Sequence, residues 1–201
     1  MKIIVWNSQD KCVADYHRLI RGCDVLCLLD CGQWTVPMYA LQIQKGLFHW
    51  KVEHEGLSYD IFYCLEKVAF VCRDGLYSGE SVLYSIHSNI GSLIGIRLQD
   101  DFWLFAHHEP NLVNAYPIGE FYLREISDRF SKAAFIADFK KKSYSWVQET
   151  VGKLYCIALP EGYYPHTVNY LFTIHVACTD LYLLEGYSET SNQPTFFELD
   201  I

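Results

Sequence analysis

A carboxylate ends one of the buried-strand patterns of this chain. The apolar run 133–137, AAFIA, is typical of a strand and stops at Asp138, with Lys140 two residues later. Ligand-binding groups of open α/β sheets lie beyond the carboxyl ends of strands, so Asp138 is a candidate for phosphate or metal chemistry. The alternative is an ordinary turn, because aspartate readily caps its own backbone.

Three other apolar runs, 2–6, 24–29 and 102–106, also end in polar residues. Carboxylate, amide and imidazole groups are metal ligands and proton carriers, so these positions are candidates too. Adjacent residues on a strand face opposite sides, so for a histidine pair we expect one ring packed and one exposed. The residues concerned are Asn7, Asp30 and the pair His107 and His108.

The elements that hold these residues begin with a crossover unit. Strand 2–6, an amphipathic helix over 9–21 and strand 24–29 predict two parallel strands in one sheet with a right-handed connection. A second helix is expected over 36–44, with Pro37 in its first turn.

The remaining elements combine hairpins with further helices. Five short β-rich runs between 59 and 107, separated by Gly, Asp, Asn or charged residues, predict antiparallel hairpins. Helices are expected over 117–132 and 143–150, and strands over 154–159, 170–177, 181–184 and 195–199. The mixture predicts an α/β fold of mixed sheets covered by helices, as one domain over residues 1–201.

Composition limits the classes of partner. With 201 residues, 51% of them hydrophobic, the chain is globular, and its net charge of −8 argues against direct nucleic-acid binding through phosphates. No signal peptide or membrane-spanning pattern is read, and we expect a cytoplasmic protein. Cys23, Cys27 and Cys31 repeat at four-residue spacing, but a strand separates such positions too far to share a metal, so we interpret them as reduced core residues.

The order of seven segments resembles the endonuclease/exonuclease/phosphatase superfamily. The matching patterns are its Trp-Asn strand end, an acid-ending strand, the strand that follows, a histidine strand, Gly-Asp-Phe-Asn, Ile-Asp-Tyr-Ile-Phe and Ser-Asp-His-x-Pro. In this chain they are segments 2–7, 24–30, 68–73, 102–108, 135–140, 168–172 and 191–194, the last followed by 196–199.

The resemblance implies a compact, trimmed four-layer α/β sandwich of two mixed β-sheets flanked by helices. It further implies metal-assisted phosphoester cleavage, with Mg²⁺ or Mn²⁺ held near Asn7 and Asp30 if the protein is active. Asp138 then occupies a catalytic position, with His107 or His108 as the matching histidines. His166 is a further histidine that could substitute.

Several residues depart from the family pattern. Lys140 replaces an asparagine and can meet a phosphate, and Asn169 replaces an aspartate. Asn192 and Gln193 stand where the family has Asp-His, and neither amide can act as a general acid or base. These four positions remain candidates for substrate or phosphate contact. A shifted alignment would instead make Asp180 or Glu189 the true acid.

Two functions follow. The first is a pseudoenzyme, for which we expect no cofactor, that binds or regulates a partner as an inhibitor, immunity protein or scaffold would. The partner expected is a basic or nucleic-acid-binding protein. The alternative is a divergent Mg²⁺-dependent phosphodiesterase, nuclease or phosphatase. Phosphate binding without turnover, through Lys140 and backbone amides, is a third and weaker interpretation.

Overall fold

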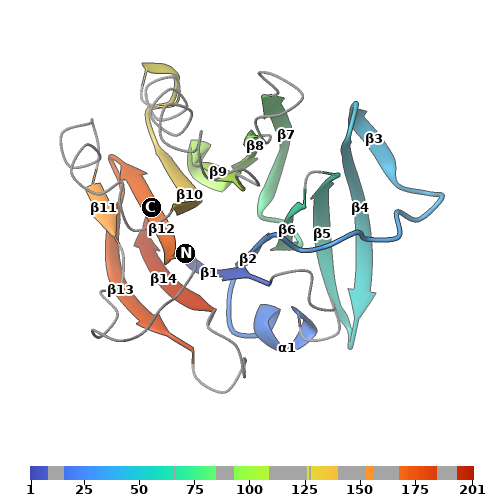
Figure 1. Ribbon diagram of the computed structural model, residues 1–201, viewed down its shortest axis with the longest axis horizontal. Helices are drawn as coiled ribbons and strands as arrows, with labels where there is room; N and C mark the ends of the chain where they lie inside the picture. The colour runs from blue at the N-terminus through green and yellow to red at the C-terminus, as the bar shows by residue number, and fades with distance from the viewer. Residues whose placement is uncertain are drawn as a thin grey trace.

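The computed structural model describes residues 1–8, 16–65, 67–84, 93–108, 126, 128–139, 153–155, 168–184 and 194–201. For 81–84, 138–139, 153–155 and 168–170 we describe the backbone only. Within these residues, fourteen strands form two sheets (Figure 1). The larger contains β1 (Lys2–Asn7), β2 (Val25–Leu29), β3 (Leu41–Gln44), β4 (Leu47–His54), β5 (Leu57–Cys64), β6 (Val68–Arg73), β13 (Ala177–Leu183) and β14 (Thr195–Asp200). The smaller contains β7 (Tyr77–Tyr84), β8 (Leu93–Leu98), β9 (Trp103–His107), β10 (Ala133–Phe139), β11 (Lys153–Tyr155) and β12 (Val168–Ile174).

Both sheets are mixed, as predicted. The strand orders are β13-β14-β1-β2-β6-β5-β4-β3 and β11-β12-β10-β9-β8-β7. β1 and β2 are parallel, as are β9 and β10, and the other neighbours are antiparallel. The parallel pair β1–β2 confirms the crossover predicted over residues 2–29.

The main core lies between the two sheets. Ile3 and Val5 of β1 share this core with Ile94 of β8 and Ile136 of β10. The alternate residues of β1, Ile4 and Trp6, face the other way and pack with α1 (Tyr16–Ile20). Burial on both faces explains why β1 and β2 read as continuous apolar runs. Figure 1 shows α1 below β1 and β2, with β8 and β9 above them.

The prediction of a helix over 36–44 is wrong. Ala40 N donates to Pro37 O at 3.0 Å in a turn, and Leu41–Gln44 then form β3 at the edge of the larger sheet. Gly46, at φ 87°, turns the chain into β4, a strand that the sequence analysis missed. Pairing with β4 therefore overrides the local helical pattern.

Flanking of the sheets by helices is not confirmed by the described residues. Helical segments there are α1, the 3₁₀ turn Gln99–Asp101 and residues 126 and 128–129. The expected helical positions 9–15, 117–125 and 143–150 lie outside the described part. No helix within the described ranges is long and apolar enough to cross a bilayer.

Candidate functional site

Two polar candidates lie at one edge of the larger sheet. Asn7 is the last residue of β1 and pairs with Leu29, the last residue of the parallel strand β2. Asp30 follows Leu29 directly, so it lies beside the carboxyl end of β1. Asn7 is buried. The parallel pairing therefore brings together the two residues predicted as metal ligands.

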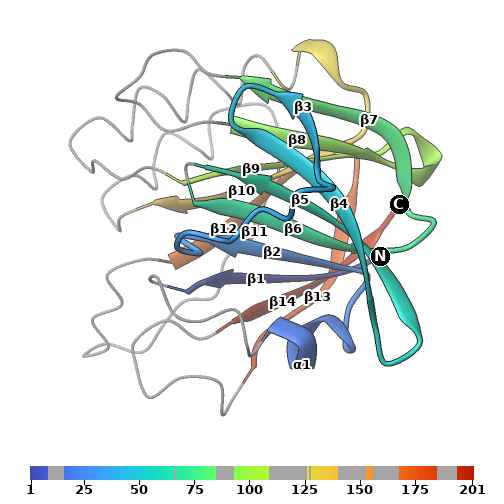
Figure 2. The same cartoon turned by 90° about the vertical axis from the view of Figure 1, so that its right-hand side faces the viewer.

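The smaller sheet presents His107, His108, Asp138 and Asn169 at the same side of the molecule. His107 pairs with Ala137 across the parallel strands β9 and β10, so His108 and Asp138 follow at neighbouring positions. Asp138 is in turn the backbone partner of Asn169 on the antiparallel strand β12. Figure 2 shows β1 and β10 ending on the same side of the fold.

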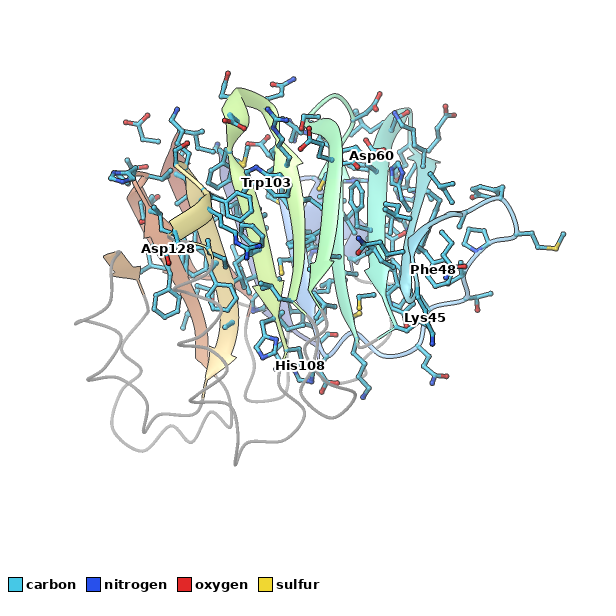
Figure 3. The ribbon with its side chains drawn as sticks, turned by 90° about the horizontal axis from the view of Figure 1, so that it is seen from above. Lys45, Phe48, Asp60, Trp103, His108 and Asp128 are labelled. Carbon is cyan, nitrogen blue, oxygen red and sulfur yellow. The ribbon has the colours of Figure 1, made fainter. Side chains whose placement is uncertain are left out.

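One contact joins the two sheets at this edge. Nε2 of His108 lies 3.7 Å from Oδ1 of Asp30. In Figure 3, His108 lies at the end of the strands opposite to Asp60 and Trp103. The strand ends of the two sheets therefore meet, as the sequence prediction requires.

Both histidines are buried, which corrects the prediction of one packed and one exposed ring. His107 is 1% exposed and His108 is 8% exposed. The alternation rule applies within a strand, and β9 ends at His107. Beyond that end, His108 lies close to Asp30 in the larger sheet.

Lys67, which was not predicted as a site residue, contacts the carboxylate of Asp30. Leu29 and Val68 are partners in the antiparallel pair β2–β6, so Lys67, which precedes Val68, lies opposite Asp30. Nζ of Lys67 donates to Oδ1 of Asp30 at 3.0 Å. A usable signal existed, because an acid ends one predicted strand and a lysine precedes the next. The pairing of those strands was needed to see it.

The backbone fixes this ion pair on both sides. Cys31 N donates to Lys67 O at 3.0 Å, and Ser8 N donates to Leu29 O at 2.9 Å. The Ser8 hydroxyl lies 3.3 Å from the carbonyl oxygen of Asp30. Asp30 and Lys67 both have positive φ, 49° and 69°, a conformation uncommon outside glycine. The carboxylate and the ammonium are therefore held by specific turns.

The described donors do not fit a divalent cation. The ammonium of Lys67 and the imidazole of His108 approach the same oxygen of Asp30. Among the residues that the structure describes, no three His, Cys, Asp or Glu side chains lie close enough together to hold a metal ion. Magnesium and calcium prefer several oxygen ligands. The described part of this cluster offers the amide of Asn7 and one carboxylate, which is already in an ion pair.

The three spaced cysteines are core residues, as interpreted. Cys23, Cys27 and Cys31 are buried free thiols. Burial raises the pKa of Cys23 to about 12. Burial also raises the pKa of Cys31, and the neighbouring Asp30 carboxylate adds to that shift. Such thiols are poor metal ligands, because metals bind the thiolate.

The remaining candidates fall into two groups. Lys140, Asn192 and Gln193 fall outside the described residues, as do Glu189 and His166. Asp180 pairs with Glu198, which in turn pairs with Lys2 at the start of β1, so Asp180 lies at the end opposite to Asn7. The alternative acid Asp180 is therefore separated from the strand-end site.

A hollow of about 240 Å³ also lies away from the site. Its walls include Trp103, the first residue of β9, whereas His107 is the last. Figure 3 shows Trp103 and His108 at opposite ends of the fold. The remaining lining residues are Glu80, Arg97, Asp101, Arg129, Phe130 and Ser131.

Comparison with known proteins supports the architecture. No family model and no curated protein matches the sequence. A humanized TDP2 from D. rerio superposes with a TM-score of 0.63 at 11% identity, over 100% of this chain and 99% of that one. This chain has the endonuclease/exonuclease/phosphatase fold. At such identities the likeness shows the fold alone.

Two further structures show the same fold. A 3' phosphatase NExo variant from Neisseria, bound to a product DNA hairpin, gives a TM-score of 0.60 at 10% identity, with 100% of both chains covered. An endonuclease/exonuclease/phosphatase from Beutenbergia cavernae gives 0.58 at 14% identity, over 99% of this chain and 71% of that one. The strand-end cluster of Asn7, Asp30 and His108 is thus built on an endonuclease/exonuclease/phosphatase scaffold.

Proposed function

We propose that this chain keeps the endonuclease/exonuclease/phosphatase fold without metal-dependent hydrolysis, and acts as a binding or regulatory protein. An inhibitor, immunity protein or scaffold is the kind of role meant. The observation that carries this proposal is the ammonium of Lys67, 3.0 Å from the Asp30 carboxylate. A cation of the protein itself thus neutralises the carboxylate for which the family resemblance implies a metal.

The sequence departures support the same proposal. Asn169, Asn192 and Gln193 carry amides where the family pattern has ionisable side chains. Amides neither exchange protons near neutral pH nor contribute negative charge to a metal site. Lys140 adds a second positive charge in place of an asparagine. Each change lowers the capacity of the site that the resemblance implies to hold a divalent cation.

The overall charge supports a basic partner. The chain carries 24 acidic and 16 basic residues, a net charge of −8. Such a surface attracts positively charged proteins and repels nucleic acid. We therefore propose a basic or nucleic-acid-binding protein as the partner, and we propose no association with a membrane.

The proposal is tested by hydrolysis. Nucleic acid, phosphodiester and phosphomonoester substrates are incubated with the wild type and with Asp138→Ala, in Mg²⁺, in Mn²⁺ and in a chelator. We expect no turnover above that of the variant in any condition. Metal-dependent turnover that disappears in Asp138→Ala would overturn the proposal and establish the divergent phosphoesterase instead.

A further inference from the structure

A ladder of five rings runs from the β4–β5 turn to the segment that follows Asp30. Its steps join His54 to His17, His17 to Tyr16, Tyr16 to Trp34 and Trp34 to Tyr63. The ring centroids along these steps are 3.9, 3.8, 5.6 and 5.6 Å apart. The two 5.6 Å separations are typical of favourable aromatic pairs, and the two steps that involve His17 are closer. The ladder therefore links α1 to two distant segments of the chain.

The ladder is bonded to the backbone directly after Asp30. The indole Nε1 of Trp34 donates to Cys31 O at 3.2 Å. The Tyr63 hydroxyl donates to Gly32 O at 3.2 Å and accepts from the Trp34 backbone N at 3.2 Å. Any movement of Trp34 is thus transmitted to residues 31–32, next to the candidate site.

The far end of the ladder is a pair of stacked histidines. The rings of His17 on α1 and His54 at the end of β4 are inclined by only 22°. The nitrogen lone pairs of an imidazole lie in the plane of its ring. In two stacked, nearly parallel rings they therefore do not converge on one point, and one metal ion cannot bind both rings. The ligand that this pair can take is the proton.

The charged groups around His17 disfavour a second positive charge. His54, on β4, and Arg21, in the turn directly after α1, both lower the pKa of His17, after the larger effect of burial. Arg21 forms an ion pair with Glu55, and Nε2 of His54 lies 3.8 Å from that same carboxylate. The Glu55 carboxylate is therefore shared between the Arg21 guanidinium and the His54 ring, rather than paired with one of them alone.

We propose that the His17–His54 stack is a proton-operated latch: it holds α1 against the β4–β5 turn at neutral pH and opens in acid. Opening displaces Tyr16 and Trp34, which frees the segment directly after Asp30. The latch does not depend on whether the site hydrolyses a phosphoester.

The sign of the effect follows from linkage. The latched state binds protons more weakly at His17 than the open state does. Latch stability is therefore complete above the pKa of the open state, about 6.5, and is lost as the pH falls below it. Each unit of difference between the two pKa values changes the opening equilibrium by up to about tenfold.

Hydrogen exchange of the full chain at pH 7.5 and pH 5.5 tests this latch, with protection corrected for intrinsic exchange rates. The peptides compared cover 16–20 and 31–36. His17→Phe and His54→Phe keep a ring but cannot be protonated. His175→Asn is the matched control, because His175 is exposed, in the β12–β13 turn, with a positive φ that asparagine tolerates.

We expect protection of both peptides to fall, by up to about tenfold, between pH 7.5 and 5.5 in the wild type and in His175→Asn. In His17→Phe the fall should disappear. In His54→Phe, where burial still lowers the pKa of His17, the fall should become smaller. An equal fall in all four proteins, or none in the wild type, would overturn the latch. A proton NMR titration of the wild type covers the case of misfolded variants. The pKa of His17 should lie below the ordinary histidine range, and the resonances of Tyr16 and Trp34 should shift over the same pH range. An ordinary pKa of His17, with no accompanying shift of Tyr16 and Trp34, would contradict the proposal.

Discussion

Lys67 and Asp30 form an ion pair across the ends of β6 and β2, with Nζ 3.0 Å from Oδ1. The antiparallel register of the two strands produces this pair, because Leu29 lies opposite Val68. The same oxygen of Asp30 lies 3.7 Å from Nε2 of His108 in the other sheet. Asp30 therefore lies between an ammonium and an imidazole at the edge where the two sheets meet.

The strength of this pair is measurable by a double-mutant cycle. Urea unfolding of the wild type, Lys67→Met, Asp30→Asn and the double variant should give a coupling of about 0.5–1 kcal/mol. The value is modest because Lys67 is 38% exposed, so water screens the pair. The coupling should shrink in about 1 M salt. No coupling at low salt would mean that the pair is absent in solution.

The core between the sheets should dominate stability. Phe70 of β6 is fully buried in this core, so Phe70→Ala should lower the free energy of unfolding by about 3–5 kcal/mol. Leu41 of β3 is 63% exposed, so Leu41→Ala should change the free energy of unfolding by less than about 0.5 kcal/mol. Urea unfolding compares the two variants. A similar effect of both would contradict the assigned burial.

The described cysteines should differ sharply in reactivity. Burial raises the pKa of Cys23 to about 12 from an ordinary 9.0, which reduces its thiolate fraction about a thousandfold. Cys178 is partly exposed, and burial raises its pKa as well. Iodoacetamide followed by peptide mapping at pH 7 and pH 9 should label Cys178 first and faster at pH 9. Rapid labelling of Cys23 in the folded protein would be inconsistent with the buried thiol.

The parts of the fold that follow from local pattern could be predicted from the sequence. The apolar runs ending at Asn7, Asp30, His107 and Asp138 are strands, and β1 and β2 are parallel as the intervening helix pattern indicated. Continuous apolar runs are a strong signal because these strands are buried on both faces. The endonuclease/exonuclease/phosphatase resemblance, drawn from the order of such segments, agrees with the fold.

The features that depend on pairing between distant segments could not be predicted. The 41–44 segment joins β4 rather than forming a helix, because sheet pairing outweighs local propensity. Lys67 reaches Asp30 only through the β2–β6 register. His108 is buried through contact between the two sheets, which strand alternation does not report. Roles for Asp138, Asn169 and the other candidates at this edge stay predictions.

Manganese binding tests the central claim, that Lys67 takes the place of a divalent cation at Asp30. Mn²⁺ is titrated into the wild type, Lys67→Ala and Lys51→Ala, with binding followed by calorimetry. Lys51, which bonds Asp74 at 2.6 Å, is the matched control lysine. We predict binding no tighter than millimolar for the wild type and Lys51→Ala. Lys67→Ala should bind about 5- to 10-fold more tightly, because one competing charge is removed. Micromolar binding by the wild type that is lost in Asp30→Asn would contradict the account.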